Sequence, residues 1–124
     1  MNKEIQKIRD ILKKRARYSS EAYQFVLLAL RFLMKQFEKP RHVSGRELLS
    51  AVKDFGFDQY GFLAHVVFES WGVKKTVDFG HIVFDLVEMD VLRKTEQDSL
   101  DDFKDVYQFE TVFREGFLTS LDQF

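Results

Sequence analysis

The stretch "EAYQFVLLALRFLMKQFEK", residues 21–39, carries the strongest helical pattern in the chain and decides the fold. Apolar residues recur in it at intervals of three and four, which places them on one face of a helix. Phe25, Leu28 and Phe32 extend the apolar surface beyond that face. Because such a helix needs neighbours on several sides, we expect it to be central, with other helices packed around it. The main stripe consists of Tyr23, Val26, Leu27, Leu30, Met34 and Phe37.

Two segments on either side of this stretch also have helical patterns. Residues 3–15 are predicted to form a basic helix whose apolar face consists of isoleucines and one leucine. The segment "HVSGRELLSAV", residues 42–52, contains a capping box. In it, the Ser44 side chain accepts a hydrogen bond from the amide of Glu47, and the Glu47 side chain accepts one from the amide of Ser44. We therefore expect a helix to begin directly after Ser44.

Three later helices are predicted, after a glycine-punctuated turn at residues 55–62. The helix over residues 59–70 should end at Gly72, which can adopt the left-handed conformation common after helix ends. Asp78 is the expected N-cap of the next helix. A short helix over residues 109–114 follows. The apolar stripes of the first two consist of Leu63, Val66 and Val67, and of Phe79, Ile82, Val83, Leu86 and Val87.

The segment "VLRKTEQDSLDDFKDVYQF", residues 91–109, departs from helical periodicity. Residues 91–94 and 103–107 could pair as two short strands around a polar tip. The predicted fold class is therefore mainly α, or α+β at most. We expect one compact domain over residues 1–124, with about five to six helices and a small β-hairpin near residues 91–107. A winged-helix-like C-terminal half is the alternative arrangement.

Composition limits the class of protein. The chain has 124 residues, of which 45% are hydrophobic and 31% charged, so it can build a packed core. It has no cysteine, which removes disulfides and thiolate metal sites. No run of eighteen apolar residues and no signal-peptide core is present, so we expect a cytoplasmic protein without membrane contact. We expect the fourteen phenylalanines mainly to fill the core.

The net charge of −1 conceals an uneven distribution. Residues 1–75 hold fifteen Lys and Arg against eight Asp and Glu, whereas residues 76–124 hold four against twelve. The halves either face each other or form part of an interaction surface. We expect the acidic tip of the predicted hairpin to lie against basic residues of the N-terminal half. Asp98, Asp101 and Asp102 should reach Lys or Arg side chains, or cap local amides, because close acidic residues repel one another.

No arrangement of residues indicates catalysis. Asp78-Phe79-Gly80 matches the kinase metal-binding triplet, but the companion kinase motifs are absent. The chain also lacks a glycine-rich phosphate loop and a Gly-x-Ser-x-Gly elbow. We therefore name no catalytic residue, no cofactor and no cofactor-binding residue, and we do not expect an enzyme.

Metal binding is only weakly indicated. His65 and Glu69 lie four residues apart on one predicted helix, and His81 and Asp85 do so on the next. Such pairs share a helix face and could hold a divalent metal between helices. The additional glutamates and the Glu-x-x-His spacing of di-iron sites are missing. Surface pairing is therefore the preferred interpretation of these four residues.

Nucleic-acid binding is the second functional hypothesis. A capped helix, a further helix and a charged hairpin follow one another as in winged-helix domains. The basic residues that would contact phosphates are Arg46, Lys53, Lys74 and Lys75. The predicted wing, however, carries more acidic than basic residues, and such a wing would repel DNA.

Several segments together resemble a family of small bacterial proteins of unknown function. The motifs are "HVSGRELL", "WGV", "DFGHIVFDLVE" and "KTEQDSLDDF", within residues 8–113. The resemblance implies a cytoplasmic bacterial protein and supplies no catalytic residue. Our first hypothesis is thus a non-enzymatic protein that acts through protein–protein interaction or self-association. Its partner surface would include Trp71, Phe117 and Phe124, since large apolar residues favour such surfaces.

Overall fold

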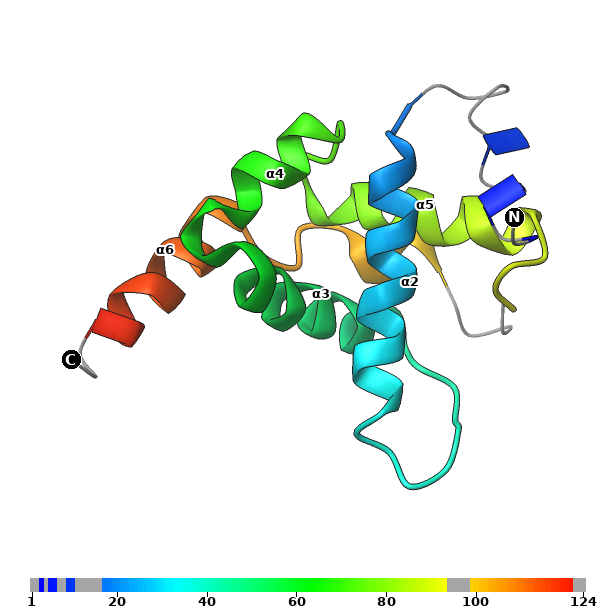
Figure 1. The fold of residues 1–124 in the computed structure, drawn as a ribbon, viewed down its shortest axis with the longest axis horizontal. Coiled ribbons are helices and arrows are strands. Elements are labelled where there is room, and N and C mark those ends of the chain that lie inside the picture. Colours follow the sequence, from blue (N-terminus) through cyan, green and yellow to red (C-terminus); the bar gives the residue numbers. More distant parts are fainter. Residues whose placement is uncertain (1–2, 4, 7–8, 11–16, 94–98, 122–124) are drawn as a thin grey trace.

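The structure, a computed structural model, describes residues 3, 5–6, 9–10, 17–93 and 99–121. These residues form helices and loops and contain no strand, so the predicted mainly α class is confirmed (Figure 1). Residues 3, 5–6 and 9–10 are helical, as expected for the basic N-terminal helix, and most of its apolar face lies outside the described residues. The other elements are α2 (Ser20–Met34), α3 (Gly45–Tyr60), the 3₁₀ helix η1 (Gly61–Leu63), α4 (Ala64–Ser70), α5 (Thr76–Glu88), the 3₁₀ helix η2 (Leu100–Phe103) and α6 (Phe109–Leu121).

The helices pack around α3 rather than around α2. Helix α3 contacts α2, η1, α4, α5, η2 and α6, whereas α2 packs mainly against α3 and α5. In Figure 1, α2 crosses α5, and α4 and α6 lie together at the end of the molecule that carries the C-terminus. The expectation that α2 is central is therefore wrong. Part of its apolar surface stays in contact with solvent, and Leu28 is 48% exposed.

A cluster of phenylalanines forms the centre of the core. The Phe68 ring is fully buried, and its centroid lies 5.2 Å from those of Phe25 and Phe79. Phe109 and Phe113 of α6 approach the same ring at 5.4 and 5.6 Å. These spacings are typical of tilted and edge-to-face aromatic pairs. Core filling by phenylalanine is confirmed for these five residues, and it joins α2, α4, α5 and α6.

Local sequence signals fix several helix ends as predicted. Ser44 Oγ accepts from the Glu47 amide at 3.1 Å, and Glu47 Oε1 accepts from the Ser44 amide at 3.1 Å, so the capping box is present. Gly72 follows α4 with a φ of +89°, which is the expected left-handed conformation. Within α5, Phe79, Ile82 and Leu86 are fully buried, and Val83 and Val87 are partly buried.

Other predicted boundaries are wrong. Helix α5 begins at Thr76 after Lys75, and Asp78 lies within its first turn. Its carboxylate accepts from the amides of Lys74 and Lys75 at 2.8 and 3.0 Å, so Asp78 caps the helix from inside. The expected turn at 55–62 is absent as far as Tyr60, because α3 continues through Gly56. A Cβ at Gly56 would lie 2.9 Å from Phe68 Cζ, which explains the glycine by close packing.

Helix α4 is shorter than predicted, and α6 is longer. Helix α4 begins at Ala64 and has only seven residues, because η1 precedes it. Helix α6 runs from Phe109 to Leu121 rather than to residue 114. Its buried residues Phe109 and Phe113 reach the aromatic core, and the turns that follow extend beyond the core. This extension brings the C-terminal turns of α6 beside η1.

The described part of residues 91–107 does not form a hairpin. Residues 91–92 are a bend, residues 94–98 lie outside the described residues, and Leu100–Phe103 is the 3₁₀ helix η2. Leu100 and Phe103 lie three apart, the spacing that aligns side chains in a 3₁₀ helix. Both pack on Gly80 of α5, where a Cβ would lie 2.8 Å from Phe103 Cβ. The described residues therefore provide no strand for a winged-helix wing.

None of the helices described here has the length and apolar character needed to span a bilayer.

Candidate functional site

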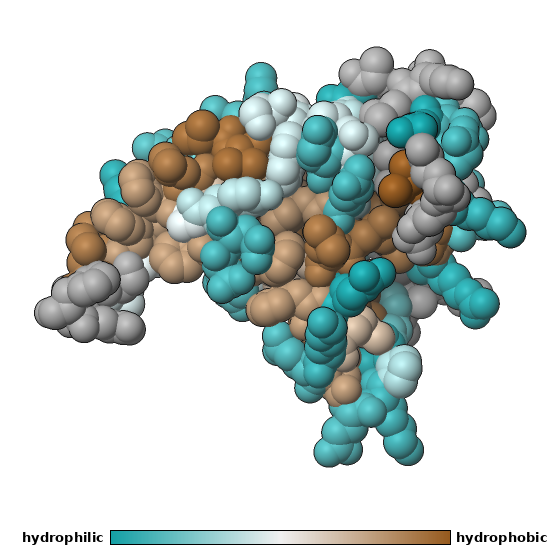
Figure 2. Space-filling view, in the orientation of Figure 1, coloured by the Kyte–Doolittle hydropathy of each residue, from teal (hydrophilic) through white to brown (hydrophobic). Residues whose placement is uncertain are grey.

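Large apolar side chains gather on one exposed surface of η1, α4 and α6. Their exposed fractions range from 42% for Phe62 to 53% for Leu118. Figure 2 shows this apolar colouring over α4 and along α6. Among the large hydrophobic residues that are exposed in the described part of the chain, only Leu28 and Tyr60 lie elsewhere. We call this surface the α4–α6 face, and it consists of Phe62, Leu63, Val66, Leu118 and Leu121.

The phase of two helices produces the α4–α6 face. In α4 the inward residues are Ala64 and Phe68, four apart, so Leu63 and Val66 point outward. In α6 the buried residues Phe109 and Phe113 set the inner side, so Leu118 lies away from the core. The rings of Phe62 and Phe117 are in tilted contact, with centroids 4.5 Å apart, and join η1 to α6.

The residues predicted for a partner surface lie in different settings. Trp71 is partly buried, with its ring 5.4 Å from that of Phe25 and 5.7 Å from that of Phe68. It therefore closes the edge of the core. Phe117 is also partly buried, but it lies beside the α4–α6 face through its contact with Phe62. Phe124 lies outside the described residues.

Sequence reasoning missed all five residues of the α4–α6 face. It assigned Leu63 and Val66 to an inner stripe because they were grouped with Val67. No sequence signal selects Phe68 over Val67 as the inward residue of this short helix, because the neighbouring side chains are all apolar.

The basic residues considered for nucleic acid lie on two segments. Arg46 and Lys53 are seven residues apart on α3, with Arg46 exposed and Lys53 partly exposed. Lys74 and Lys75 are exposed in the turn before α5. Their convergence on one surface stays a prediction.

The four metal candidates do not form a ligand set with the other described residues. Within these residues, no group of three or more His, Asp and Glu side chains is placed to hold a metal ion. His65 Nδ1 lies 3.1 Å from the carbonyl oxygen of Phe62. Asp85 is 2% exposed and accepts a 2.7 Å hydrogen bond from the Tyr23 hydroxyl. Glu69 is exposed on α4, and His81 is partly buried on α5. The structure thus gives Asp85 a role in joining helices.

The acidic residues around η2 are compensated locally. Asp102 Oδ2 accepts from the Ser99 amide at 3.2 Å, as expected for a residue that caps a backbone amide. Asp101 pairs with Lys104 at 2.9 Å, and this pairing raises the pKa of Lys104. Asp101 therefore reaches a Lys side chain, as expected, but that lysine belongs to the same segment and not to the N-terminal half. Asp98 lies outside the described residues.

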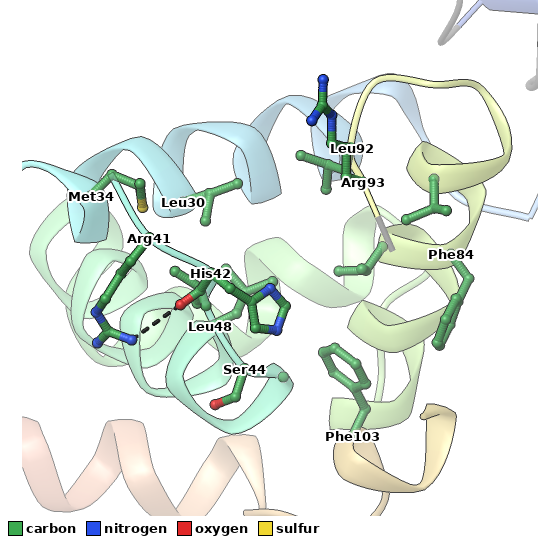
Figure 3. A pocket seen from close by; sticks show the side chains of 14 residues that line it. Leu30, Met34, Arg41, His42, Ser44, Leu48, Phe84, Leu92, Arg93 and Phe103 are labelled. Carbon is green, nitrogen blue, oxygen red and sulfur yellow. Dashed lines mark hydrogen bonds between the residues drawn. The ribbon is translucent and has the colours of Figure 1, made fainter. Parts of the chain in front are cut away.

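A pocket of about 260 Å³ opens between α2, α3 and α5 (Figure 3). Leu30 and Met34 of α2 form one wall, and Val83 and Val87 of α5 form the opposite wall. The close-up in Figure 3 shows Arg41 at one side of the pocket, His42 near its centre, and Arg93 at its upper edge with the guanidinium pointing away from Phe103.

A charge pair holds Arg41 at one end of this pocket. The Arg41 guanidinium donates to both Glu47 carboxylate oxygens, at 2.5 and 3.4 Å, and to the His42 carbonyl oxygen at 3.1 Å. It also lies 3.9 Å above the centre of the Phe37 ring. The hydrogen bond from Arg41, and then that from the Ser44 amide, lowers the pKa of Glu47 to about 2. Arg41 is thus a fixed and largely neutralised part of the rim.

Comparison of the chain with protein-family models, with curated proteins and with solved structures gave no match. The resemblance to small bacterial proteins therefore stays a prediction based on its motifs.

Proposed function

We propose that the protein is a non-enzymatic interaction module that pairs with a second copy of itself through the α4–α6 face. The observation that carries this proposal is the concentration of exposed Phe62, Leu63, Val66, Leu118 and Leu121 on three adjoining elements. Isolated exposed apolar residues are normal on soluble proteins, but a contiguous group of them is typical of an interaction site. Burial of this group against another molecule removes apolar surface from water.

The size of the face indicates a small contact. A standard interface uses roughly 20–30 residues on each side. Twelve described residues of η1, α4 and α6 are exposed, so a dimer formed through this face alone belongs to the smaller and weaker class of interfaces. Its apolar centre lies beside charged residues, which is the usual arrangement of an interface core with a polar rim.

The charges beside the face favour a second copy as the partner. Glu69 on α4 and the neighbouring Arg114 and Glu115 on α6 are exposed and carry both signs. In a two-fold symmetric dimer, each patch meets its own copy in reverse orientation. A surface with both signs can then place Arg114 of one protomer against a glutamate of the other. A partner surface that carries charges of a single sign would repel either Arg114 or the two glutamates.

Light scattering coupled to size-exclusion chromatography tests the proposal. The intact chain at about 100 µM, well above the dissociation constant of an ordinary micromolar dimer, should have twice its monomer mass of 14.7 kDa. The variant Leu118→Glu should be monomeric, because it places a charge in the apolar face. A monomeric intact chain at this concentration would refute the proposal.

Leu28→Glu is the matched control. Leu28 is 48% exposed and Leu118 is 53% exposed, but Leu28 lies on α2, outside the α4–α6 face. The Leu28→Glu protein should therefore remain dimeric. Equal loss of the dimer in both variants would mean that the face is not the contact surface. Circular dichroism of both variants confirms that their helices are intact.

A further inference from the structure

The pocket between α2, α3 and α5 forms where the apolar faces of α2 and α5 do not contact each other. Helix α2 ends at Met34, and the chain then leaves it and returns at Val43. Leu30, Val83 and Val87 face the resulting space and are only partly buried, although they belong to the stripes that pack on the core. An apolar wall that the protein's own residues leave partly uncovered can receive an apolar ligand.

The floor of the pocket is rigid and apolar. Leu48 and Phe103 lie there with exposed fractions of 5% and 3%. Gly45 adjoins them, and a Cβ at this position would lie 2.9 Å from the Phe103 ring. Because this part of the floor is tightly packed, the pocket does not depend on the movement of an exposed side chain.

The volume of the pocket limits the size of a ligand. Its 260 Å³ lies just below the range of about 300–1,000 Å³ that is usual for ligand sites. At roughly 30 Å³ for each small group, as for a water molecule in the liquid, this space holds a chain of about eight to ten atoms. A protein domain or a large cofactor does not fit inside.

Among the described residues, the charges on the rim have one sign. Arg41, His42 and Arg93 line the pocket, and no Asp or Glu of residues 17–93 and 99–121 does so. Glu47 compensates Arg41, whereas Arg93 has no carboxylate within ion-pair distance among residues 17–93 and 99–121. The Arg93 end of the pocket is thus where an anionic group gains most.

We propose that this pocket binds a small amphipathic organic anion, with an apolar chain of about eight to ten carbon atoms, as its volume allows. The chain lies between the walls formed by Leu30, Val83 and Val87. The carboxylate or related anionic group lies at the mouth, near Arg93. This site is separate from the α4–α6 face, and its function does not depend on self-association.

Nuclear magnetic resonance of the ¹⁵N-labelled protein with decanoate as the probe tests the proposal. Decanoate should shift the amide signals of Gly45, Leu48 and Val87 in a saturable manner. Decylamine, which has the same chain and a positive charge, should bind at least about fivefold more weakly, a ratio expected for one partly exposed charge pair. Equal binding of the two probes, or shifts confined to the α4–α6 face, would overturn the proposal.

Two variants separate the contributions of charge and shape. Arg93→Glu should weaken decanoate binding by about fivefold or more, for the same electrostatic reason. Arg46→Glu is its control, because Arg46 is an exposed arginine on α3 that does not line the pocket. Val83→Trp fills the space between the walls and should abolish the shifts. If Val83→Trp does not fold, the comparison of Arg93→Glu with Arg46→Glu still decides the matter, and equal affinities in these two would count against the site.

Discussion

Tyr23 on α2 donates a 2.7 Å hydrogen bond to the Asp85 carboxylate on α5, and the two residues are 0% and 2% exposed. This contact joins two helices whose residues are 62 positions apart in the chain. A buried carboxylate is costly unless polar groups surround it, so the hydroxyl of Tyr23 helps to make Asp85 compatible with the core.

Tyr23→Phe should destabilise the protein by about 1–3 kcal/mol, because it removes a hydrogen bond from a buried carboxylate while it keeps the ring. Urea denaturation monitored by circular dichroism measures this change. Tyr60→Phe is the control, since Tyr60 is 38% exposed, and it should change the free energy of unfolding by less than about 0.5 kcal/mol. Equal effects of the two substitutions would show that the buried hydrogen bond contributes little.

Glu47 gives the fold a dependence on acid pH. Its pKa is lowered from 4.5 to about 2 by Arg41 and by the Ser44 amide. A carboxyl group with a lowered folded-state pKa stabilises the protein above its unfolded pKa, and this contribution is lost as the pH falls toward the folded pKa. Stability should therefore decrease between about pH 4.5 and pH 2 for this reason.

Glu47→Gln isolates the charge, because glutamine can still accept from the Ser44 amide. The side chains of Arg41 and Glu47 are 48% and 39% exposed, so solvent screening keeps the effect to about 1 kcal/mol or less. Urea denaturation at pH 6 and at pH 3 should show a smaller pH-dependent loss of stability in Glu47→Gln than in the parent protein. The same loss in both proteins would mean that the pairing of Arg41 with Glu47 does not stabilise the helix.

Two glycines with positive φ offer a direct test of close packing. Gly72 has φ +89°, and a Cβ there would lie 2.8 Å from the Arg17 carbonyl oxygen, whereas Gly61 has φ +62° and no atom within 4 Å. Gly61 combines its positive φ with a ψ of −144°, a conformation that glycine alone adopts readily, so Gly61→Ala should cost about 1–3 kcal/mol of backbone strain without a steric clash. Gly72→Ala places a Cβ against the Arg17 carbonyl oxygen in addition to the strain of its own positive φ, and should cost more. Thermal unfolding of both variants ranks them, and a Gly61→Ala protein that is the less stable would contradict this reasoning.

The features that could be predicted from the sequence are those that few neighbouring residues determine. The capping box needs only Ser44 and Glu47, and the left-handed turn needs only Gly72. The 3₁₀ helix η2 could not be predicted in this way, because it depends on contact between Phe103 and Gly80, which lie on separate elements. A local pattern of alternating polar and apolar residues therefore gave a hairpin instead.

From the sequence, we predicted a residue beside the candidate surface but none of the residues that form it. Phe117 was named from the sequence and lies beside the α4–α6 face, but Trp71 packs against Phe25 and Phe68. The inward or outward orientation of a residue on a seven-residue helix depends on which single side chain enters the core. For α4 that side chain is Phe68, and only the tertiary structure identifies it.

Thr76 connects the segment that contains η2 to the beginning of α5. Its hydroxyl donates to the Phe103 carbonyl oxygen at 2.6 Å and accepts from the Val106 amide at 3.2 Å, and the residue is 1% exposed. Thr76→Val keeps the shape of the side chain but leaves both backbone groups without this partner. We expect a loss of about 1–3 kcal/mol, the usual cost of unpaired buried polar groups.

The loss should be concentrated around residues 103–106, so hydrogen exchange is the informative measurement. The Val106 amide should exchange faster in Thr76→Val than in the parent protein, because its acceptor is gone. Thr111→Val, an exposed substitution on α6, is the matched control and should leave this rate unchanged. If the Val106 amide exchanges equally slowly in all three proteins, the position of η2 is maintained by the packing of Phe103 against Gly80 and not by the Thr76 hydroxyl.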